Sequence, residues 1–365
     1  MFQNLNHTNS SDALPTLIEC IGAALGMTLL ALTGLVLYLF VIAIIIIYFA
    51  DQFNNSFYRF LVCLGASDSL LLTVFLLYVV PMTLLQAASD GPLDQFMGFL
   101  ALLSYFCSCG TLVSIAINRC MAVCRPRWCA RVYTKPTLLL NIVLICVLGL
   151  AMSAPQLVGL VNYYYVPSSF NWAYDMSKPY ASLCSSFEQA FTTATAGSLV
   201  VAYCLILIEL RKQQLQIAEA EPGPLDIQTS LKEEMSLSLQ FLGVAVFVIF
   251  IDVTFYVLPL YTTYRWHLFV ATMLYILNSC NNPVIYLLTN YQLRLRAKGL
   301  LGMVHGPPTE ITEEVNQPAA AVHLYLRAAS AYAHSAKTVS SADRRMFELR
   351  NKAKIAVANS ISESN

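Results

Sequence analysis

The chain has 365 residues, of which 57% are hydrophobic and only 12% are charged, against roughly a quarter for a soluble domain. Lysine plus arginine and aspartate plus glutamate number 21 each, so the net charge gives no indication of a nucleic-acid-binding protein. These values favour a membrane protein over a soluble domain.

Long apolar runs decide the class of fold. Five runs without an acidic or basic residue each reach the ~20 residues that a helix needs to cross hydrocarbon, and two more qualify if one aspartate, Asp68 or Asp252, is allowed inside each. In chain order, the seven runs cover residues 20–50, 60–89, 95–118, 136–174, 189–208, 235–264 and 266–293. A soluble fold would need one very large core to bury them. The sequence therefore predicts an all-α membrane protein, a bundle of seven transmembrane helices.

The distribution of lysine and arginine predicts the orientation of this bundle. One set of alternate loops holds basic clusters at 119–135 and 294–298, whereas the opposite set holds only Lys178 and Arg265. The first set should be cytoplasmic, which places the N-terminus outside. Residues 1–16 form a polar outer tail without the features of a cleavable signal peptide, and its glycosylation sequons at Asn6 and Asn9 agree with that side.

The chain is predicted to have three segments: the outer tail 1–16, a transmembrane domain 17–303 that includes the amphipathic helix, and a cytoplasmic tail 304–365. Residues 288–301 predict a short amphipathic eighth helix. In this interpretation Leu293, Leu295 and Leu300 face lipid. Arg294, Arg296 and Lys298 face the lipid phosphates. The last segment is dominated by polar and charged residues and is predicted to be largely disordered.

Three of the apolar runs carry short polar motifs. They read Leu64-x-x-x-Asp68 in the second run, Asn118-Arg119-Cys120 with Pro126 seven residues after the arginine in the third, and Asn282-Pro283-x-x-Tyr286 in the seventh. A lone arginine at the edge of a span often only snorkels to the interface. All three motifs together, each on its own helix, resemble the rhodopsin-like G-protein-coupled receptors. Asn118 in place of that family's aspartate is similar to outlying members such as the nematode chemoreceptor families.

The resemblance implies a receptor in the plasma membrane that transmits binding of an unknown extracellular ligand to a heterotrimeric G protein. The coupling and activation residues that it implies are Asn118, Arg119, Tyr203, Glu233, Pro283 and Tyr286. In that family a glutamate at the position of Glu233 holds the third-helix arginine in the resting state. Because Asn118 carries no charge, Glu233 is expected to be the main restraint on Arg119.

Asp68 is expected to have partners inside the bundle, because an intramembrane carboxylate costs roughly 2.5–3.5 kcal/mol on insertion scales. The resemblance implies an allosteric sodium ion beside it and no required cofactor. The other implied ligands of this ion are Ser108, Asn278, Ser279 and Asn282. A hydrogen-bond network without an ion is the alternative.

The ligand pocket is also implied by the resemblance. Its expected residues are Tyr105, Phe106, Glu188, Asp252, Thr272 and Tyr275. Asp252 is a second intramembrane carboxylate, and a protonated aspartate bonded to a neighbouring Ser or Thr is the alternative to a functional role.

The chain has eleven cysteines, of which only Cys20 and Cys184 lie on the predicted outer side. Since disulfides form in oxidising compartments, these two are expected to pair. The resembled family usually has a disulfide between the outer loop and the top of the third helix. This disulfide cannot form here, because Asp94 stands at the third-helix position of the cysteine.

Other functions remain open from the sequence. One is a seven-helix protein with a scavenging or trafficking role and no G protein. Another is a transporter or channel, although the two halves of the chain show no repeat. The five histidines have neither metal-ligand nor catalytic-triad spacing, so an enzyme is not expected.

Overall fold

The computed structural model describes residues 14–48, 56–87, 91–219 and 264–301, with interrupted positions between 242 and 261. The chain divides into two compact units, one formed by residues 1–209 with 234–308 and the other by 210–233 with 309–365. Of the second unit, the structure describes only residues 210–219, the last turns of one helix. The predictions for Asn6, Asn9, Glu233, Asp252 and the C-terminal tail lie outside the described residues.

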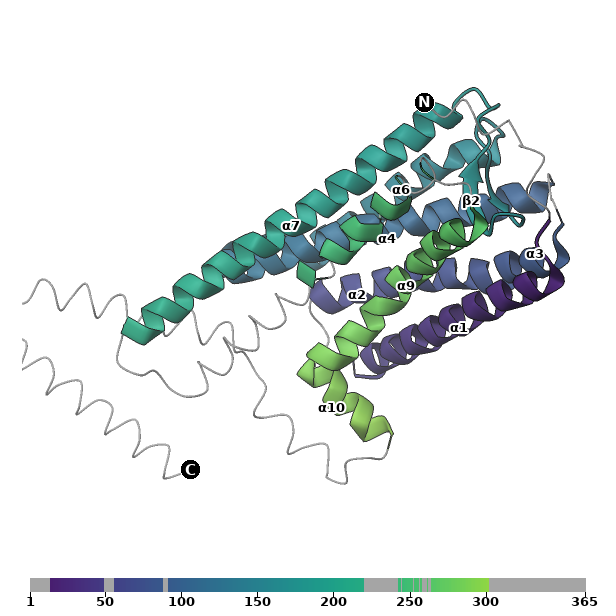
Figure 1. The fold of residues 1–365 in the computed structure, drawn as a ribbon. Coiled ribbons are helices and arrows are strands. Elements are labelled where there is room, and N and C mark those ends of the chain that lie inside the picture. The colour runs from purple at the N-terminus through teal and green to yellow at the C-terminus, as the bar shows by residue number, and fades with distance from the viewer. Residues whose placement is uncertain are drawn as a thin grey trace, which may run out of the picture. The chain divides into compact units, whose positions relative to one another are not determined.

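Within the described residues, six helices are long and apolar enough to cross a membrane. Their bounds are α1 Leu17–Ile47, α2 Ser56–Val74 continued by the π-helical turn η1 Phe75–Val79 and by α3 Val80–Leu85, α4 Pro92–Cys124, α6 Lys135–Leu157, α7 Ala181–Glu219 and α9 Arg265–Thr289. A shorter apolar helix at Ala245–Phe255 occupies the predicted sixth span. Figure 1 shows α1, α2, α4 and α9 running lengthwise through the fold.

Local sequence explains how several of these helices begin or change course. Thr16 and Glu19 form a capping box at the start of α1, each side chain binding the other's backbone N–H. Pro81 has no N–H to donate to the carbonyl oxygen one turn earlier, so the regular α-helical hydrogen bonding is interrupted before it. The interruption is the π-helical turn η1, which directly precedes α3. Pro92 stands in the first turn of α4, where its missing donor costs nothing.

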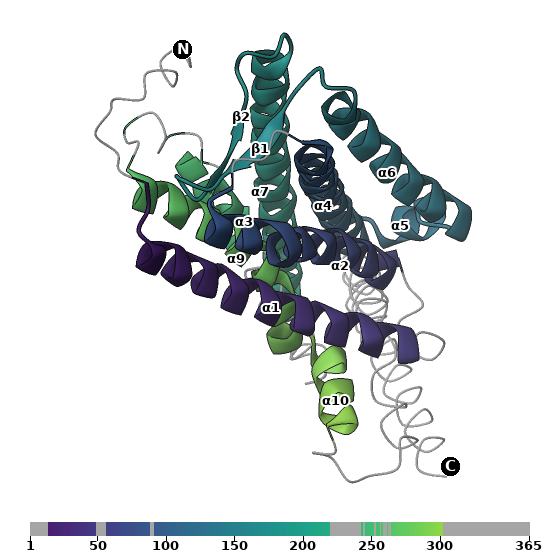
Figure 2. The same ribbon diagram turned by 90° about the vertical axis from the view of Figure 1, so that its right-hand side faces the viewer.

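The loop between α6 and α7, predicted to lie on the outer side, contains a β-hairpin that the sequence did not predict. Strands β1 (Tyr163–Val166) and β2 (Asn171–Tyr174) pair antiparallel, with Tyr163 opposite Tyr174 and Val166 opposite Asn171. Figure 2 shows the hairpin over the ends of the helices, beside the start of α7. Its aromatic side chains point into the bundle, since Tyr165, Phe170 and Trp172 are all buried.

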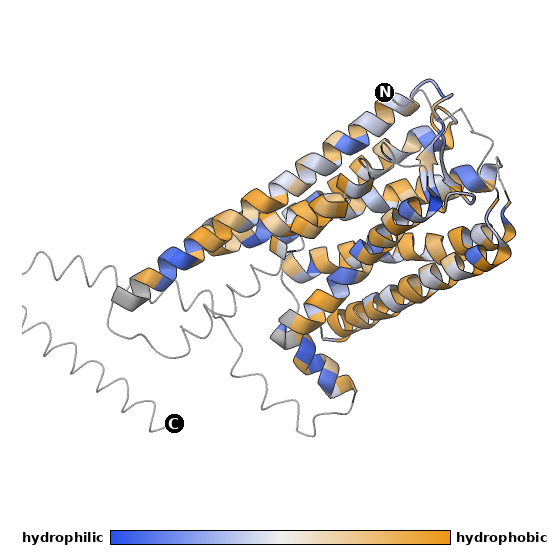
Figure 3. Cartoon of the chain, in the orientation of Figure 1, coloured by the Kyte–Doolittle hydropathy of each residue, from blue (hydrophilic) through white to orange (hydrophobic). Residues whose placement is uncertain are grey.

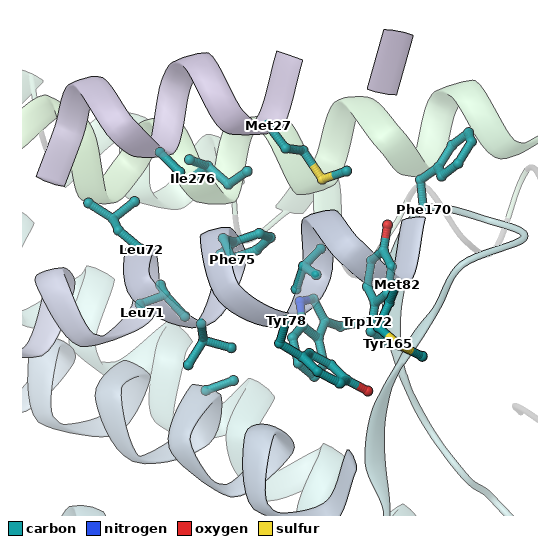
Figure 4. Close-up of a cluster of buried hydrophobic side chains, with 14 of the residues drawn as sticks. Met27, Leu71, Leu72, Phe75, Tyr78, Met82, Tyr165, Phe170, Trp172 and Ile276 are labelled. Carbon is teal, nitrogen blue, oxygen red and sulfur yellow. The ribbon is translucent and has the colours of Figure 1, made fainter. Parts of the chain in front are cut away.

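These aromatic side chains belong to the main hydrophobic cluster. The cluster joins α1, α2, η1, α4 and α9 to the hairpin, with Met27, Phe75, Trp172 and Ile276 among its members (Figure 4). The ring of Trp172 stacks on that of Tyr163, with centroids 5.1 Å apart. Figure 3 shows that apolar residues extend along the helices, as lipid-facing surfaces require.

Two short helices lie outside the spans. Helix α5 (Pro126–Val132) forms within the predicted second cytoplasmic loop, and α10 (Tyr291–Leu300) corresponds to the predicted eighth helix. The predicted faces of α10 are wrong in part. Leu293 is fully buried, and Arg296 is only 7% exposed, with its guanidinium 4.7 Å from the centre of the Tyr48 ring. Arg296 therefore packs against α1, because a flat guanidinium stacks well on an aromatic face.

Candidate functional site

The middle of the bundle contains a polar cluster around Asp68. This carboxylate is 2% exposed and accepts hydrogen bonds from the hydroxyl of Ser108 at 2.8 Å and from the amide of Asn282 at 3.2 Å. The Ser279 side chain lies against it as well. The structure thus brings together residues from α2, α4 and α9 that were expected to surround one site. Among the residues that the structure describes, Asn278 makes no hydrogen bond to this group.

Sequence reasoning missed one member of this cluster. The hydroxyl of Tyr38, in α1, donates a hydrogen bond to Oδ2 of Asp68, and its side chain is 1% exposed. Tyr38 is the only residue with a polar side chain between Gly34 and Ile47. That isolation was a usable signal, because a phenol inside an aliphatic span needs a partner.

The donor set around Asp68 fits a network of protein hydrogen bonds better than a sodium site. A carboxylate offers about four lone-pair positions. Tyr38 and Asn282 donate to Oδ2, Ser108 donates to Oδ1, and Ser279 lies alongside. A cation would need oxygen lone pairs that these donors already occupy. The residues present therefore do not fit a directly bound ion while Tyr38 keeps this position.

At the predicted cytoplasmic end, several of the residues expected to act in coupling lie close together. The guanidinium of Arg119 lies over the Phe57 ring, 5.3 Å from its centre. Tyr203, 3% exposed on α7, lies near both Arg119 and Tyr286. Pro283 lies inside α9, one turn before the buried Tyr286. Arg119 of α4 is thus next to Phe57 of α2 and Tyr203 of α7, and Tyr203 connects it with Tyr286 of α9.

The Asn118 side chain has other partners than the Arg119 side chain. Its amide donates a 2.9 Å hydrogen bond to the hydroxyl of Ser56, and its side chain is 3% exposed. The Cys129 sulfur of α5 lies 3.9 Å from the side-chain amide nitrogen of Asn118 and 3.9 Å from its backbone carbonyl oxygen. Burial raises the pKa of the Cys129 thiol, so it stays protonated in this contact. Asn118 thus connects α4 with the start of α2 and with α5.

Several predicted pocket residues lie close together in the half of the bundle that is predicted to face outward. The ring of Tyr105 lies 5.6 Å from that of Phe106 and 6.0 Å from that of Tyr275, centre to centre. The hydroxyl of Tyr105 also bonds that of Thr192. One turn earlier on α7, Glu188 is 6% exposed and accepts a 2.5 Å hydrogen bond from Tyr174. The site is a group of rings with hydroxyls and one buried carboxyl group.

Thr272 makes contacts that the sequence did not predict. It is 1% exposed, and its hydroxyl donates to the backbone oxygen of Phe170 at 2.8 Å. The same hydroxyl lies 3.1 Å from the side-chain oxygen of Asn171. Thr272 therefore holds the hairpin, because its one donor is directed at the turn between β1 and β2.

A comparison with protein families decides the class of receptor. The model of the family described as Serpentine type 7TM GPCR chemoreceptor Srx matches residues 29–290. The chain belongs to this family. No curated protein sequence matches it. The family confirms the resemblance to chemoreceptors and the seven-helix bundle, and it identifies the chain as a multi-pass membrane receptor.

The disulfide expected in this Srx receptor is not formed. Cys20 and Cys184 are both free, and they lie in different surroundings. Cys20 is buried in the cluster shared by α1 and the hairpin, with its sulfur 4.0 Å from the Pro15 carbonyl oxygen. Cys184 instead lines a small cavity with Phe106 and Tyr174. Sharing an oxidising compartment is not enough for a disulfide, because the two cysteines must also lie close together with suitable geometry.

Hydrogen bonds hold the hairpin of the Srx receptor without that bridge. The Gln156 amide at the end of α6 donates to the Tyr163 carbonyl oxygen at 3.0 Å and accepts from the Tyr163 N–H at 2.7 Å. The Tyr165 hydroxyl bonds that of Thr83 at 2.8 Å, and burial raises the pKa of this phenol. Asp94, where the usual bridge would begin, accepts a hydrogen bond from Tyr78.

Proposed function

We propose that this Srx receptor lies in the plasma membrane with its N-terminus outside and couples an extracellular small molecule to a heterotrimeric G protein. The meeting of Arg119, Tyr203 and Tyr286 at one end of the bundle is the observation that carries this proposal. Family membership supports the receptor role. An arginine at this position is suited to bind the carbonyl and carboxyl groups of a partner that docks between the helices.

The resting state of this receptor is only weakly favoured. Glu233 is the proposed restraint on Arg119, and a partly exposed ion pair is worth ~0–1 kcal/mol. The Phe57 ring adds a cation–π contact of about 0.5–1 kcal/mol at an exposed site. Asn118 contributes no charge and is directed at Ser56. An appreciable minority of molecules therefore adopts the active conformation without ligand.

Agonist-independent nucleotide exchange on a G protein tests this mechanism. Receptors are reconstituted at equal amounts as wild type, Glu233→Ala and Arg119→Ala, with Lys178→Ala in the predicted outer loop as a matched control. Basal exchange should be measurable in the wild type, higher in Glu233→Ala, unchanged in Lys178→Ala and lost in Arg119→Ala. Equal exchange in all four proteins would favour a receptor that does not couple to G proteins.

The ring cluster at the outer end supports a proposal for the class of ligand. Tyr105, Phe106 and Tyr275 offer aromatic faces, and Glu188 offers a buried carboxyl group. Rings attract flat apolar molecules and cations, whereas the carboxyl group favours hydrogen-bond donors and disfavours anions. The preferred ligand is thus a small aromatic molecule that donates a hydrogen bond or carries a positive charge.

A ligand panel tests this class. Aromatic alcohols and amines are compared with the matching carboxylates in the exchange assay, on wild type, Glu188→Gln and the exposed control Gln189→Leu. Responses to alcohols or amines, weakened at least tenfold in Glu188→Gln and retained in the control, are expected. A preference for the carboxylates would contradict the proposed ligand class while leaving coupling intact.

A further inference from the structure

The position of Tyr38 beside Asp68 has a consequence for ion binding that does not depend on G-protein coupling. Asp68 lies on α2, and the helices around it each contribute a donor: Tyr38 from α1, Ser108 from α4 and Asn282 from α9. Tyr38 is the largest of these side chains and is buried to the same degree as Asp68. Its hydroxyl therefore takes both an acceptor position of the carboxylate and the space beside it.

The backbone of α2 is shaped around the Tyr38 ring. A Cβ atom on Gly65, three residues before Asp68, would lie 3.1 Å from a ring carbon of Tyr38 and 2.9 Å from Ile42. Such distances are tighter than ordinary packing allows, so the absence of a side chain at 65 leaves room for the phenol. The ring is thus held in place by packing as well as by its hydrogen bond.

We propose that the Tyr38 hydroxyl occupies the position a sodium ion would take beside Asp68, so that this receptor binds no sodium there. The carboxylate is held by protein donors alone. The Tyr38 bond also ties α1 to α2, and the Asn282 bond ties α9 to the same carboxylate. With the Ser108 bond to α4, Asp68 thereby links α2 directly to three other helices, and the link does not vary with the sodium concentration.

Thermal unfolding of the purified full-length receptor in detergent tests this proposal. The midpoint is measured in NaCl and in KCl at matched ionic strength, because a ligand that binds only the folded state raises the midpoint with its concentration. The wild type should show no difference between the two salts. Tyr38→Phe keeps the ring but removes the hydroxyl, and it should gain a sodium-specific rise of at least about 2 °C.

Two further variants make the result specific. Tyr58→Phe removes another buried hydroxyl, which accepts a hydrogen bond from Asn290, and should remain insensitive to sodium. Adding Asp68→Asn to Tyr38→Phe should abolish the gained response, because the negative ligand is lost. If Tyr38→Phe does not fold, Tyr38→Leu takes its place.

The proposal is overturned by either of two outcomes. A sodium-specific rise in the wild type, removed by Asp68→Asn, would mean that an ion binds despite Tyr38. If neither the wild type nor the folded Tyr38 variant responds to sodium, something other than the Tyr38 hydroxyl excludes the ion.

Discussion

The Thr272 hydroxyl of α9 donates a 2.8 Å hydrogen bond to the backbone oxygen of Phe170, at the turn of the β1–β2 hairpin. The two residues are 102 positions apart in the chain, and both are buried. Phe170 has a positive φ of 56°, which costs a residue with a side chain and must be stabilised by its surroundings. Thr272 supplies part of that stabilisation, and the Phe170 ring packs against Phe269 one turn earlier.

Thr272→Val should destabilise the receptor, because it leaves the buried Phe170 oxygen without this donor. A loss of about 1–3 kcal/mol in the free energy of unfolding is expected. Thr33→Val is the matched control, since the Thr33 hydroxyl bonds only its own helix and is exposed. That variant should change the stability by less than about 0.5 kcal/mol. Equal shifts in the two unfolding midpoints would mean that the hairpin contact contributes nothing.

Gln156→Leu should loosen the hairpin, because one side chain satisfies both backbone groups of Tyr163. Removing it takes one hydrogen bond from a buried N–H and one from a buried carbonyl oxygen, at a cost of about 1–3 kcal/mol each. Hydrogen exchange should become faster at Tyr163 and in β2, while the exchange of α1 stays unchanged. Gln189→Leu, at an exposed position of α7, should leave the hairpin as protected as in the wild type.

Gly34→Ala should disturb the contact between α1 and α9. A Cβ atom at residue 34 would lie 2.2 Å from the sulfur of Cys280, so either this sulfur must leave its contact with the Leu30 carbonyl oxygen or one of the two helices must shift. Overpacking of this kind typically costs about 1–3 kcal/mol. Gly22→Ala is the control on the same helix, because a Cβ there meets nothing within 4 Å.

The double variant Gly34→Ala with Cys280→Ala decides whether the clash is the cause. Removing the sulfur should restore most of the lost unfolding midpoint relative to Cys280→Ala alone. An unfolding midpoint that stays low in the double variant would assign the effect of Gly34→Ala to another contact, such as that with Leu72.

Arg296→Ala should destabilise the receptor more than Lys298→Ala. Arg296 is buried over the Tyr48 ring, and a largely desolvated cation–π contact is worth about 2 kcal/mol. Lys298 is exposed on the same helix. The comparison is made by thermal unfolding in a neutral detergent, where no lipid phosphates are present. Equal midpoints for both variants would instead support the lipid-facing role expected from the sequence.

The sequence alone determined the class of fold and the spans. Runs such as 20–50 and 95–118 contain no charge, and a segment of that length in hydrocarbon must satisfy its backbone hydrogen bonds as a helix. The resemblance to the receptor family further implied that Asp68, Ser108 and Asn282 would meet. Helical geometry added that Ser108, eleven residues before Arg119, shares one face of its helix with that arginine.

Tertiary structure decided which contacts the remaining residues make. Tyr38 joins Asp68, Thr272 holds the hairpin, and Arg296 packs inward, although all three lie in segments whose helical state was predicted correctly. Their partners are in other helices or in the hairpin, and the rotation of one helix against another is set by packing across the bundle. Periodicity shows which residues share a face, but a face acquires its neighbour only when helices distant in the chain come together.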